Sequence, residues 1–331
     1  MKKPIGIFLK TAIPILIGVV LIYYSISKMT PESRSMLWEN IKNADPYWIG
    51  LSLLLGFISH SLRAYRWKYL LEPLGCKPRY TVSFVAVMIA YLANLGIPRS
   101  GEILRAVTLS NYEGLSFEKS FGTIISERVA DLVMLLLVVG SAFFMQSGNL
   151  LNYLEQQDVN VFATLGIVAL GLLLLVGFLR LIRRSQNKWL VKINGFLQGI
   201  LEGIGSILKM KNKGWFILHT FLIWGIYLLM FWVIKFAIPG MEFTALGTIL
   251  VAFVAGSFSI STTNGGLGIF PYPIVVGAVF VFSGISQEQG EAFGWVIWGS
   301  QTALNIVIGG LSFLLLPLLT KRATVQKEEA K

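Results

Sequence analysis

Repeated apolar runs, each about the length of a membrane crossing, limit this chain to one fold class. A bilayer core about 30 Å thick needs about 20 apolar residues per spanning helix, and a helix satisfies its own backbone hydrogen bonds in lipid. Of the 331 residues, 55% are hydrophobic and 14% charged, and the mean hydropathy is +0.69. Soluble domains are more highly charged. We therefore predict an all-α polytopic membrane protein, a single transmembrane domain (1–331) with about six spanning helices, at 7–27, 47–71, 120–145, 161–182, 214–237 and 291–317.

Three further apolar runs are shorter and adjoin breaks rich in glycine or proline. They cover 81–97, 244–261 and 269–285. Non-helical backbone is tolerated at membrane depth only where protein or a wet cavity satisfies it. We therefore expect a re-entrant segment at 81–97 and a re-entrant hairpin at 244–285. An inverted repeat would look like this, because the helices that follow the two breaks then run in opposite directions, although the halves share no residue-level similarity.

The distribution of basic residues predicts the orientation. The stretch 183–213 holds seven lysines and arginines against one acid, whereas 146–160 and 285–291 hold acids and no base. Basic loops stay in the cytoplasm. This pattern predicts a multi-pass protein of a bacterial-type inner membrane with both termini cytoplasmic, including a short tail at 318–331. It also accounts for the net charge of +11 without nucleic acid binding.

Two other segments have a predicted place at the membrane. The apolar run after Lys3 is too long for a signal-peptide core and lacks a convincing cleavage site, so we expect an uncleaved first helix. Apolar residues recur at helical spacing over 187–208, which predicts an amphipathic helix in the cytoplasmic interface or a lid packed over the bundle.

Cysteine and histidine are too few for a disulfide or a metal site. The single cysteine is Cys76, and His60 and His219 share no metal-ligand spacing. No cofactor is expected.

Charged residues inside apolar runs are the strongest functional signal, because each costs about 2.5–3.5 kcal/mol at a helix centre. Arg63 and Arg66 share one face near the end of the run 47–71. A helix end with arginines reaching toward lipid phosphates would explain Arg66. Arg63 lies deeper, which favours a functional role.

The break after 81–97 carries the most specific pattern. Pro98 interrupts the chain, and a helix that begins near Ser100 would place free N–H groups beside Arg99, which favours an anion site. Glu102 and Arg105 lie one turn apart and could pair. A solvated interfacial loop is the alternative.

The run 120–145 begins with three charges. Glu127 and Asp131 share a face, whereas Arg128 is offset by about 100°. The two acids are natural counter-ions for Arg63, Arg99 or Arg105, and a purely structural buried network is the alternative.

The tip of the second break is uncharged. Its hydroxyl, amide and glycine residues, which include Thr263, Asn264 and Gly266, could expose backbone N–H groups to a ligand. A glycine-rich tip that merely allows close packing is the alternative. Gln301 and Asn305, one turn apart, are a weaker signal for the same cavity.

Four ordered motifs resemble the transmembrane region of the lysylphosphatidylglycerol synthase family, over about residues 5–318. They are Arg63-x-x-Arg66-Trp67, Asn94-x-x-x-Pro98-x-x-Gly101-Glu102-x-x-Arg105, Gly122-Thr123-x-x-x-Glu127-Arg128-x-x-Asp131 and Gly265-Gly266-Leu267-Gly268. The resemblance implies a lipid-translocating domain with re-entrant helices, which in the synthases moves aminoacylated phosphatidylglycerol between leaflets. Members often carry a glutamate where this chain has Pro271. No aminoacyltransferase domain follows before Lys331, so we expect a free-standing member that does not make the lipid.

The expected function is flippase-like: binding and translocation of an anionic phospholipid or a polyprenyl-phosphate carrier, without catalysis. An ion-coupled transporter of a small solute, with Glu127 and Asp131 carrying protons, is the first alternative, and a lipid-modifying membrane enzyme or a scaffold is less favoured. Oligomerisation stays open. The candidate substrate-binding residues are Arg63, Arg66, Asn94, Arg99, Glu102, Arg105, Glu127, Arg128, Asp131, Thr263, Asn264 and Gly266.

Overall fold

The computed structural model is all-helical over the residues it describes. These are Tyr23, Tyr24, Ser27 and the ranges 30–97, 99–156, 210–267 and 269–319, with side chains described to residue 146 in the second range. The described ranges contain no strand, only an isolated bridge between Asn264 and Leu267. The α-helices are α2 (Pro31–Lys42), α3 (Pro46–Arg66), α4 (Lys68–Leu71), α5 (Tyr80–Gly96), α6 (Ser100–Glu113), α7 (Phe117–Gln156), α10 (Lys213–Val233), α11 (Leu246–Thr262), α12 (Tyr272–Phe282) and α13 (Gln287–Leu315).

Three of the described helical segments are long and apolar enough to cross a membrane. They are Phe117–Gln146 in α7, Lys213–Phe236 in α10 and Gln287–Leu318 in α13. Helix α3 has 21 residues and is long enough, but its polar side chains make it less apolar than these three segments. The expected spans 7–27 and 161–182 lie outside the described residues, apart from Tyr23, Tyr24 and Ser27. The amphipathic segment 187–208 and nearly all of the tail also lie outside them. The chain is a multi-pass all-α membrane protein.

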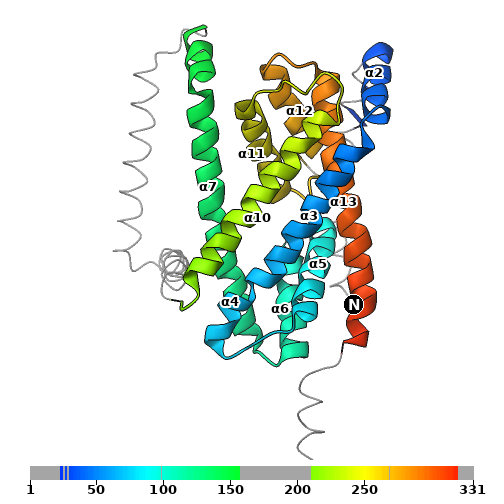
Figure 1. Ribbon diagram of the computed structural model, residues 1–331. Coiled ribbons are helices and arrows are strands. Elements are labelled where there is room, and N and C mark those ends of the chain that lie inside the picture. The colour runs from blue at the N-terminus through cyan, green and yellow to red at the C-terminus, as the bar shows by residue number, and fades with distance from the viewer. Residues whose placement is uncertain are drawn as a thin grey trace, which may run out of the picture.

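Two short helical hairpins lie within the bundle and approach each other from opposite ends. Helices α5 and α6 pack together in the lower half of Figure 1, and α11 and α12 pack together in the upper half. The tips touch, since the Asn264 side-chain amide donates to the Gly96 carbonyl at 3.3 Å. Gly265 has φ +60°, and a Cβ there would lie 2.7 Å from Leu95 Cδ2. Glycine at this position therefore lets the tips approach closely.

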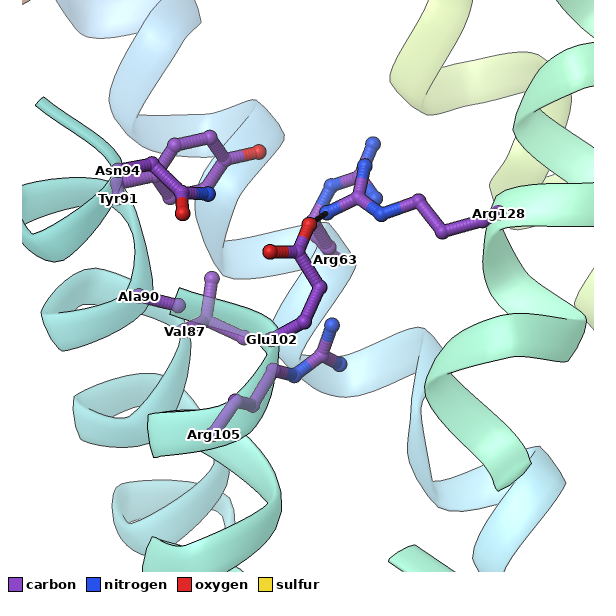
Figure 2. Close-up of a pocket in the computed structure, with 8 residues that line it drawn as sticks. All are labelled: Arg63, Val87, Ala90, Tyr91, Asn94, Glu102, Arg105 and Arg128. Carbon is purple, nitrogen blue, oxygen red and sulfur yellow. Dashed lines mark ion pairs between the residues drawn. The ribbon is translucent and has the colours of Figure 1, made fainter. Parts of the chain in front are cut away.

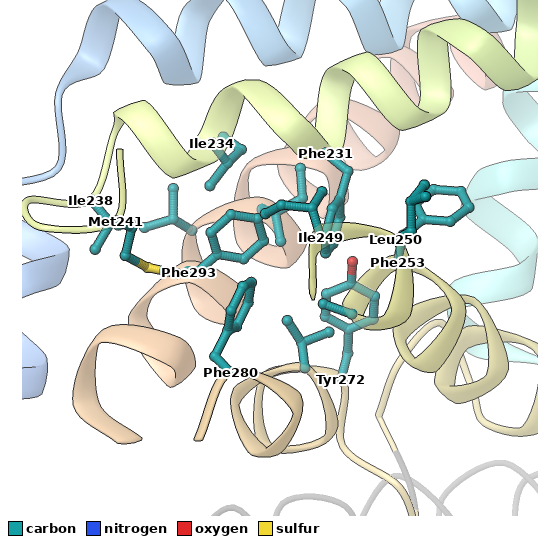
Figure 3. Packing of buried hydrophobic residues seen from close by; sticks show 14 of the residues in the cluster. Phe231, Ile234, Ile238, Met241, Ile249, Leu250, Phe253, Tyr272, Phe280 and Phe293 are labelled. Atoms are coloured by element: carbon teal, nitrogen blue, oxygen red, sulfur yellow. The ribbon is translucent and has the colours of Figure 1, made fainter. Parts of the chain in front are cut away.

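Aromatic packing holds the end of the bundle that contains α12. Phe231, Phe280 and Phe293 are almost fully buried, and the Phe293 ring lies 4.9 Å from Phe231 and 4.8 Å from Phe280, measured between ring centroids (Figure 3). A second apolar cluster surrounds Trp67 and Phe216 near the other end, where α3, α6, α7 and α10 meet. The charged residues singled out in the sequence lie beside this second cluster.

Candidate functional site

Three helices bring the predicted charged residues together. Arg63 and Arg66 lie in the last turn of α3, Arg105 lies on the inner side of α6, and Glu127 and Asp131 lie one turn apart on α7. The i,i+3 and i,i+4 spacings place each pair on one helix face, so the charges of α3 and α7 meet between the helices. The site is therefore built from side chains of regular helices.

Ion pairs join the charges of opposite sign. Arg63 Nη1 lies 2.7 Å from Asp131 Oδ2. Arg66 Nη2 lies 3.2 Å from Asp131 Oδ1 and 3.4 Å from Glu127 Oε1, and Arg105 pairs with the other oxygen of Glu127. The two acids are thus the counter-ions of Arg63 and Arg105, as expected, and of Arg66 as well.

Burial makes this network expensive to disrupt. Arg66 and Glu127 are 0% exposed, and Arg105 is 3% exposed. A buried charge is tolerated only when ion pairs and hydrogen bonds compensate it. The interpretation of Arg66 as a helix-end residue that reaches toward lipid phosphates is therefore wrong, because its guanidinium points into the bundle and donates to Thr220 at 2.8 Å.

Arg128 and Glu102 form the accessible edge of the cluster. Arg128 Nη2 lies 3.1 Å from Glu102 Oε1, and the Arg128 side chain is 48% exposed against 19% for Glu102. Arg128 also approaches Asp131 at 3.6 Å. The Glu102–Arg105 pair that the spacing allows does not form, because Arg105 pairs with Glu127 and Glu102 pairs with Arg128 of α7. Arg128 is thus the most exposed charge of the network.

A pocket lies between this edge and α5. The pocket is small, and Figure 2 shows the lining side chains Arg63, Val87, Ala90, Tyr91, Asn94, Glu102, Arg105 and Arg128. Arg105 Nε and Nη2, and Glu102 Oε2, are buried and have no hydrogen-bond partner among the described residues. Unpartnered buried donors are costly, so a hydrogen-bond acceptor in this pocket would stabilise Arg105.

The break between α5 and α6 is closed by Asn94. Its Oδ1 accepts from the Gly101 N–H at 2.8 Å, and a Cβ at Gly101 would lie 2.2 Å from the Ala90 carbonyl oxygen. Helix α6 begins at Ser100, as expected, but one of its first N–H groups is thus already capped by protein. Arg99, with φ 62°, is exposed and neither lines the pocket nor forms an ion pair with a described residue.

The tip of the second hairpin satisfies its own polar groups. Thr263 donates to the Ser259 carbonyl at 2.6 Å and accepts from the Gly266 N–H at 3.1 Å. Asn264 bonds to the first tip, and none of the three predicted residues here lines the pocket. Pro271 is the N-cap residue of α12. Within the described residues, this geometry supports the packing alternative for the tip.

Sequence reasoning missed the polar residues of α10. Thr220 holds Arg66, Trp224 Nε1 donates to Asp131 at 3.4 Å, and the Tyr227 hydroxyl accepts from Arg63 Nε at 3.4 Å. Tyr227 also lies 3.0 Å from the Tyr91 hydroxyl, at the pocket. The signal was their spacing of four and three residues, which puts all three on one face of an otherwise apolar helix.

The described residues contain no group of three or more side chains suited to hold a metal ion. Two arginines that face the pocket, Arg63 and Arg105, instead suit an anion, because guanidinium groups bind phosphate or carboxylate through charge-assisted hydrogen bonds. What the arrangement offers chemically is a partly enclosed pocket lined by three arginines.

Comparisons with known proteins agree with the motifs. The family described as "Lysylphosphatidylglycerol synthase TM region" matches residues 11–316. A UPF0104 membrane protein of Methanothermobacter thermautotrophicus is 23% identical over 306 residues, which are 86% of this chain and 88% of that protein.

A UPF0104 membrane protein of Methanocaldococcus jannaschii is 28% identical over 189 residues. That match covers 52% of this chain and spans about half, 55%, of the relative. No solved structure matches the chain. Because the family match covers nearly the whole of this membrane protein, the chain belongs to the lysylphosphatidylglycerol synthase transmembrane-region family.

Proposed function

We propose that this protein binds the anionic head group of a lipid in the Arg63–Arg105–Arg128 pocket and carries it between the leaflets of the membrane, without covalent chemistry. One observation carries the proposal: Arg63, Arg105 and Arg128 line one pocket beside a break between two helices, and two nitrogen atoms of the buried Arg105 have no hydrogen-bond partner among the described residues. Broken helices at membrane depth are a common setting for transport sites. An anionic phospholipid and a polyprenyl-phosphate carrier both supply the required phosphate.

The competing assignment of Glu127 and Asp131 as proton carriers gains no support from their contacts. Glu127 faces Arg66 and Arg105, and Asp131 faces Arg63, Arg66 and Arg128. Carboxylates compensated in this way are suited to hold the arginines in place. We therefore assign them the role of positioning the pocket's cations, in a cytoplasmic-facing half of an inner-membrane protein.

The test is lipid flipping in proteoliposomes that contain fluorescent phosphatidylglycerol, measured by chemical quenching of the outer leaflet. Arg128→Gln removes a half-exposed charge at the pocket edge, so the fold should persist. A charge-assisted hydrogen bond contributes about 1.5–3 kcal/mol, and we expect flipping to slow about tenfold or more.

Lys213→Gln is the matched control, because it removes one positive charge from an exposed position outside the pocket. It should flip lipid at the wild-type rate. Equal rates for Arg128→Gln and wild type would overturn the site assignment, and an inactive wild-type protein would overturn the function.

A further inference from the structure

The charged cluster around the pocket contains one more positive charge than negative charges. Its four guanidinium groups belong to Arg63, Arg66, Arg105 and Arg128, and its three carboxylates belong to Glu102, Glu127 and Asp131. Four positive charges against three negative charges leave a net charge of +1. The next ion pair, between Arg79 and Glu113 at 2.8 Å, adds no net charge.

Histidine does not change this count. His60 is buried on α3, one turn before Arg63, and its ring packs at a tilt against Tyr91, with 4.2 Å between the ring centroids. A second positive charge so close to Arg63 is unfavourable, so His60 is counted as neutral. Among the described residues, the cluster thus has one positive charge more than its carboxylates balance, and three of its four arginines are buried.

An uncompensated buried charge is costly, and a bound anion of equal and opposite charge removes that cost. From this balance we infer that the ligand of the pocket is the head group of a monoanionic phosphodiester lipid, rather than a dianionic phosphomonoester such as a polyprenyl monophosphate. The inference rests on the proposed function and narrows the two ligand classes that the proposal left open.

The residues that line the pocket also favour a ligand with a single negative charge. Arg105 Nε and Nη2 offer buried donors to a phosphate oxygen, but Glu102 Oε2 lies unpartnered in the same lining. A carboxylate repels the second charge of a dianion, whereas it accepts a hydrogen bond from a hydroxyl group beside a phosphodiester. Figure 2 shows Glu102 between Arg105 and Arg128, where it would face the ligand.

The experiment measures which lipid the purified protein retains. The full chain is placed in nanodiscs with equal amounts of phosphatidylcholine, phosphatidylglycerol and phosphatidic acid at pH 8, extracted mildly, and its retained lipids are quantified by mass spectrometry. A phosphomonoester is largely dianionic at this pH, because its second ionisation lies near pH 6. We expect phosphatidylglycerol to be enriched at least tenfold over phosphatidic acid, because one unmatched charge at contact distance and an effective dielectric constant of about 20 is unfavourable by more than a tenfold ratio requires.

Two variants change the charge of the pocket in opposite directions. Glu102→Gln raises the cluster to +2 and should move the ratio about tenfold toward phosphatidic acid, whereas Arg128→Gln lowers it to zero and should abolish the preference for either anion over phosphatidylcholine. Glu118→Gln, which removes an acid from an exposed position outside the pocket, should leave the wild-type ratio unchanged.

The outcomes separate the inference from the proposed function. Anion enrichment that favours phosphatidic acid in the wild type, or a ratio that Glu102→Gln leaves unchanged, would overturn charge matching while the anion site stands. Equal retention of all three lipids would overturn the proposed function itself. Soluble glycerophosphoglycerol should compete only weakly with phosphatidylglycerol for the pocket. If it displaces the lipid at equal concentration, the pocket is assigned to a water-soluble phosphodiester instead.

Discussion

Arg66 and Arg128 belong to one ion-pair network but differ most in burial, and this difference predicts unequal costs of substitution. The Arg66 side chain is 0% exposed and that of Arg128 is 48% exposed. Removing one partner of a buried ion pair costs about 3–5 kcal/mol, because the other charge stays buried. Exposed pairs contribute about 0–1 kcal/mol.

The geometry refines the magnitude for Arg66→Gln. Glu127 keeps Arg105 and Asp131 keeps Arg63, so neither acid is left alone, and we expect the lower end of the range, about 3 kcal/mol. Arg128→Gln should cost about 1 kcal/mol or less. The difference of about 2 kcal/mol corresponds to roughly a thirtyfold change in the unfolding equilibrium constant.

Unfolding by dodecyl sulfate in mixed micelles, followed by tryptophan fluorescence, measures this difference. Arg66→Lys provides an intermediate case: it keeps the charge but loses the planar fork that reaches Thr220 and both acids. If Arg66→Gln and Arg128→Gln destabilise the protein equally, the burial of the network does not determine its energetics, and the reasoning fails.

Two further predictions concern the first hairpin. Gly101→Ala would place a Cβ 2.2 Å from the Ala90 carbonyl oxygen and should destabilise the protein by about 1–3 kcal/mol. As its control on the neighbouring helix α7, Gly122→Ala meets no atom within 4 Å of its Cβ and should stabilise that helix by up to about 1 kcal/mol. Thermal unfolding in detergent tests both substitutions. Arg99→Ala should slow lipid flipping less than Arg128→Gln does, because Arg99 is exposed and does not line the pocket; a larger loss would place Arg99 on the transport path.

Local patterns predicted the elements that depend on local physics. Hydropathy located the helices α7, α10 and α13, and the break near Pro98 located the start of α6 at Ser100. The rule that membrane-embedded charges need partners also identified Glu127 and Asp131 as counter-ions before any contact was known. The helices and the break follow from residues within one or two turns, whereas the counter-ions follow from the cost of an unpaired charge in a membrane.

The partners of individual charges could not be predicted in this way. Whether Glu102 pairs with Arg105 or Arg128 depends on how α6 rotates against α7, and this rotation is set by close packing such as that of Gly101 on Ala90. The α10 face that holds Arg66 and Arg63 was overlooked for a related reason. Threonine, tryptophan and tyrosine are ordinary residues in a spanning helix until tertiary packing aims them at a charge.

The contact between the two hairpin tips has a mechanical consequence. Asn264 and Gly96 share one 3.3 Å hydrogen bond, worth about 1 kcal/mol, whereas the aromatic core around Phe293 is continuous across several helices. Helix α13 packs against both hairpins, so parting the tips leaves the helices of the aromatic core in contact. Within the described residues, the two tips should therefore separate at a smaller cost in free energy than the core does.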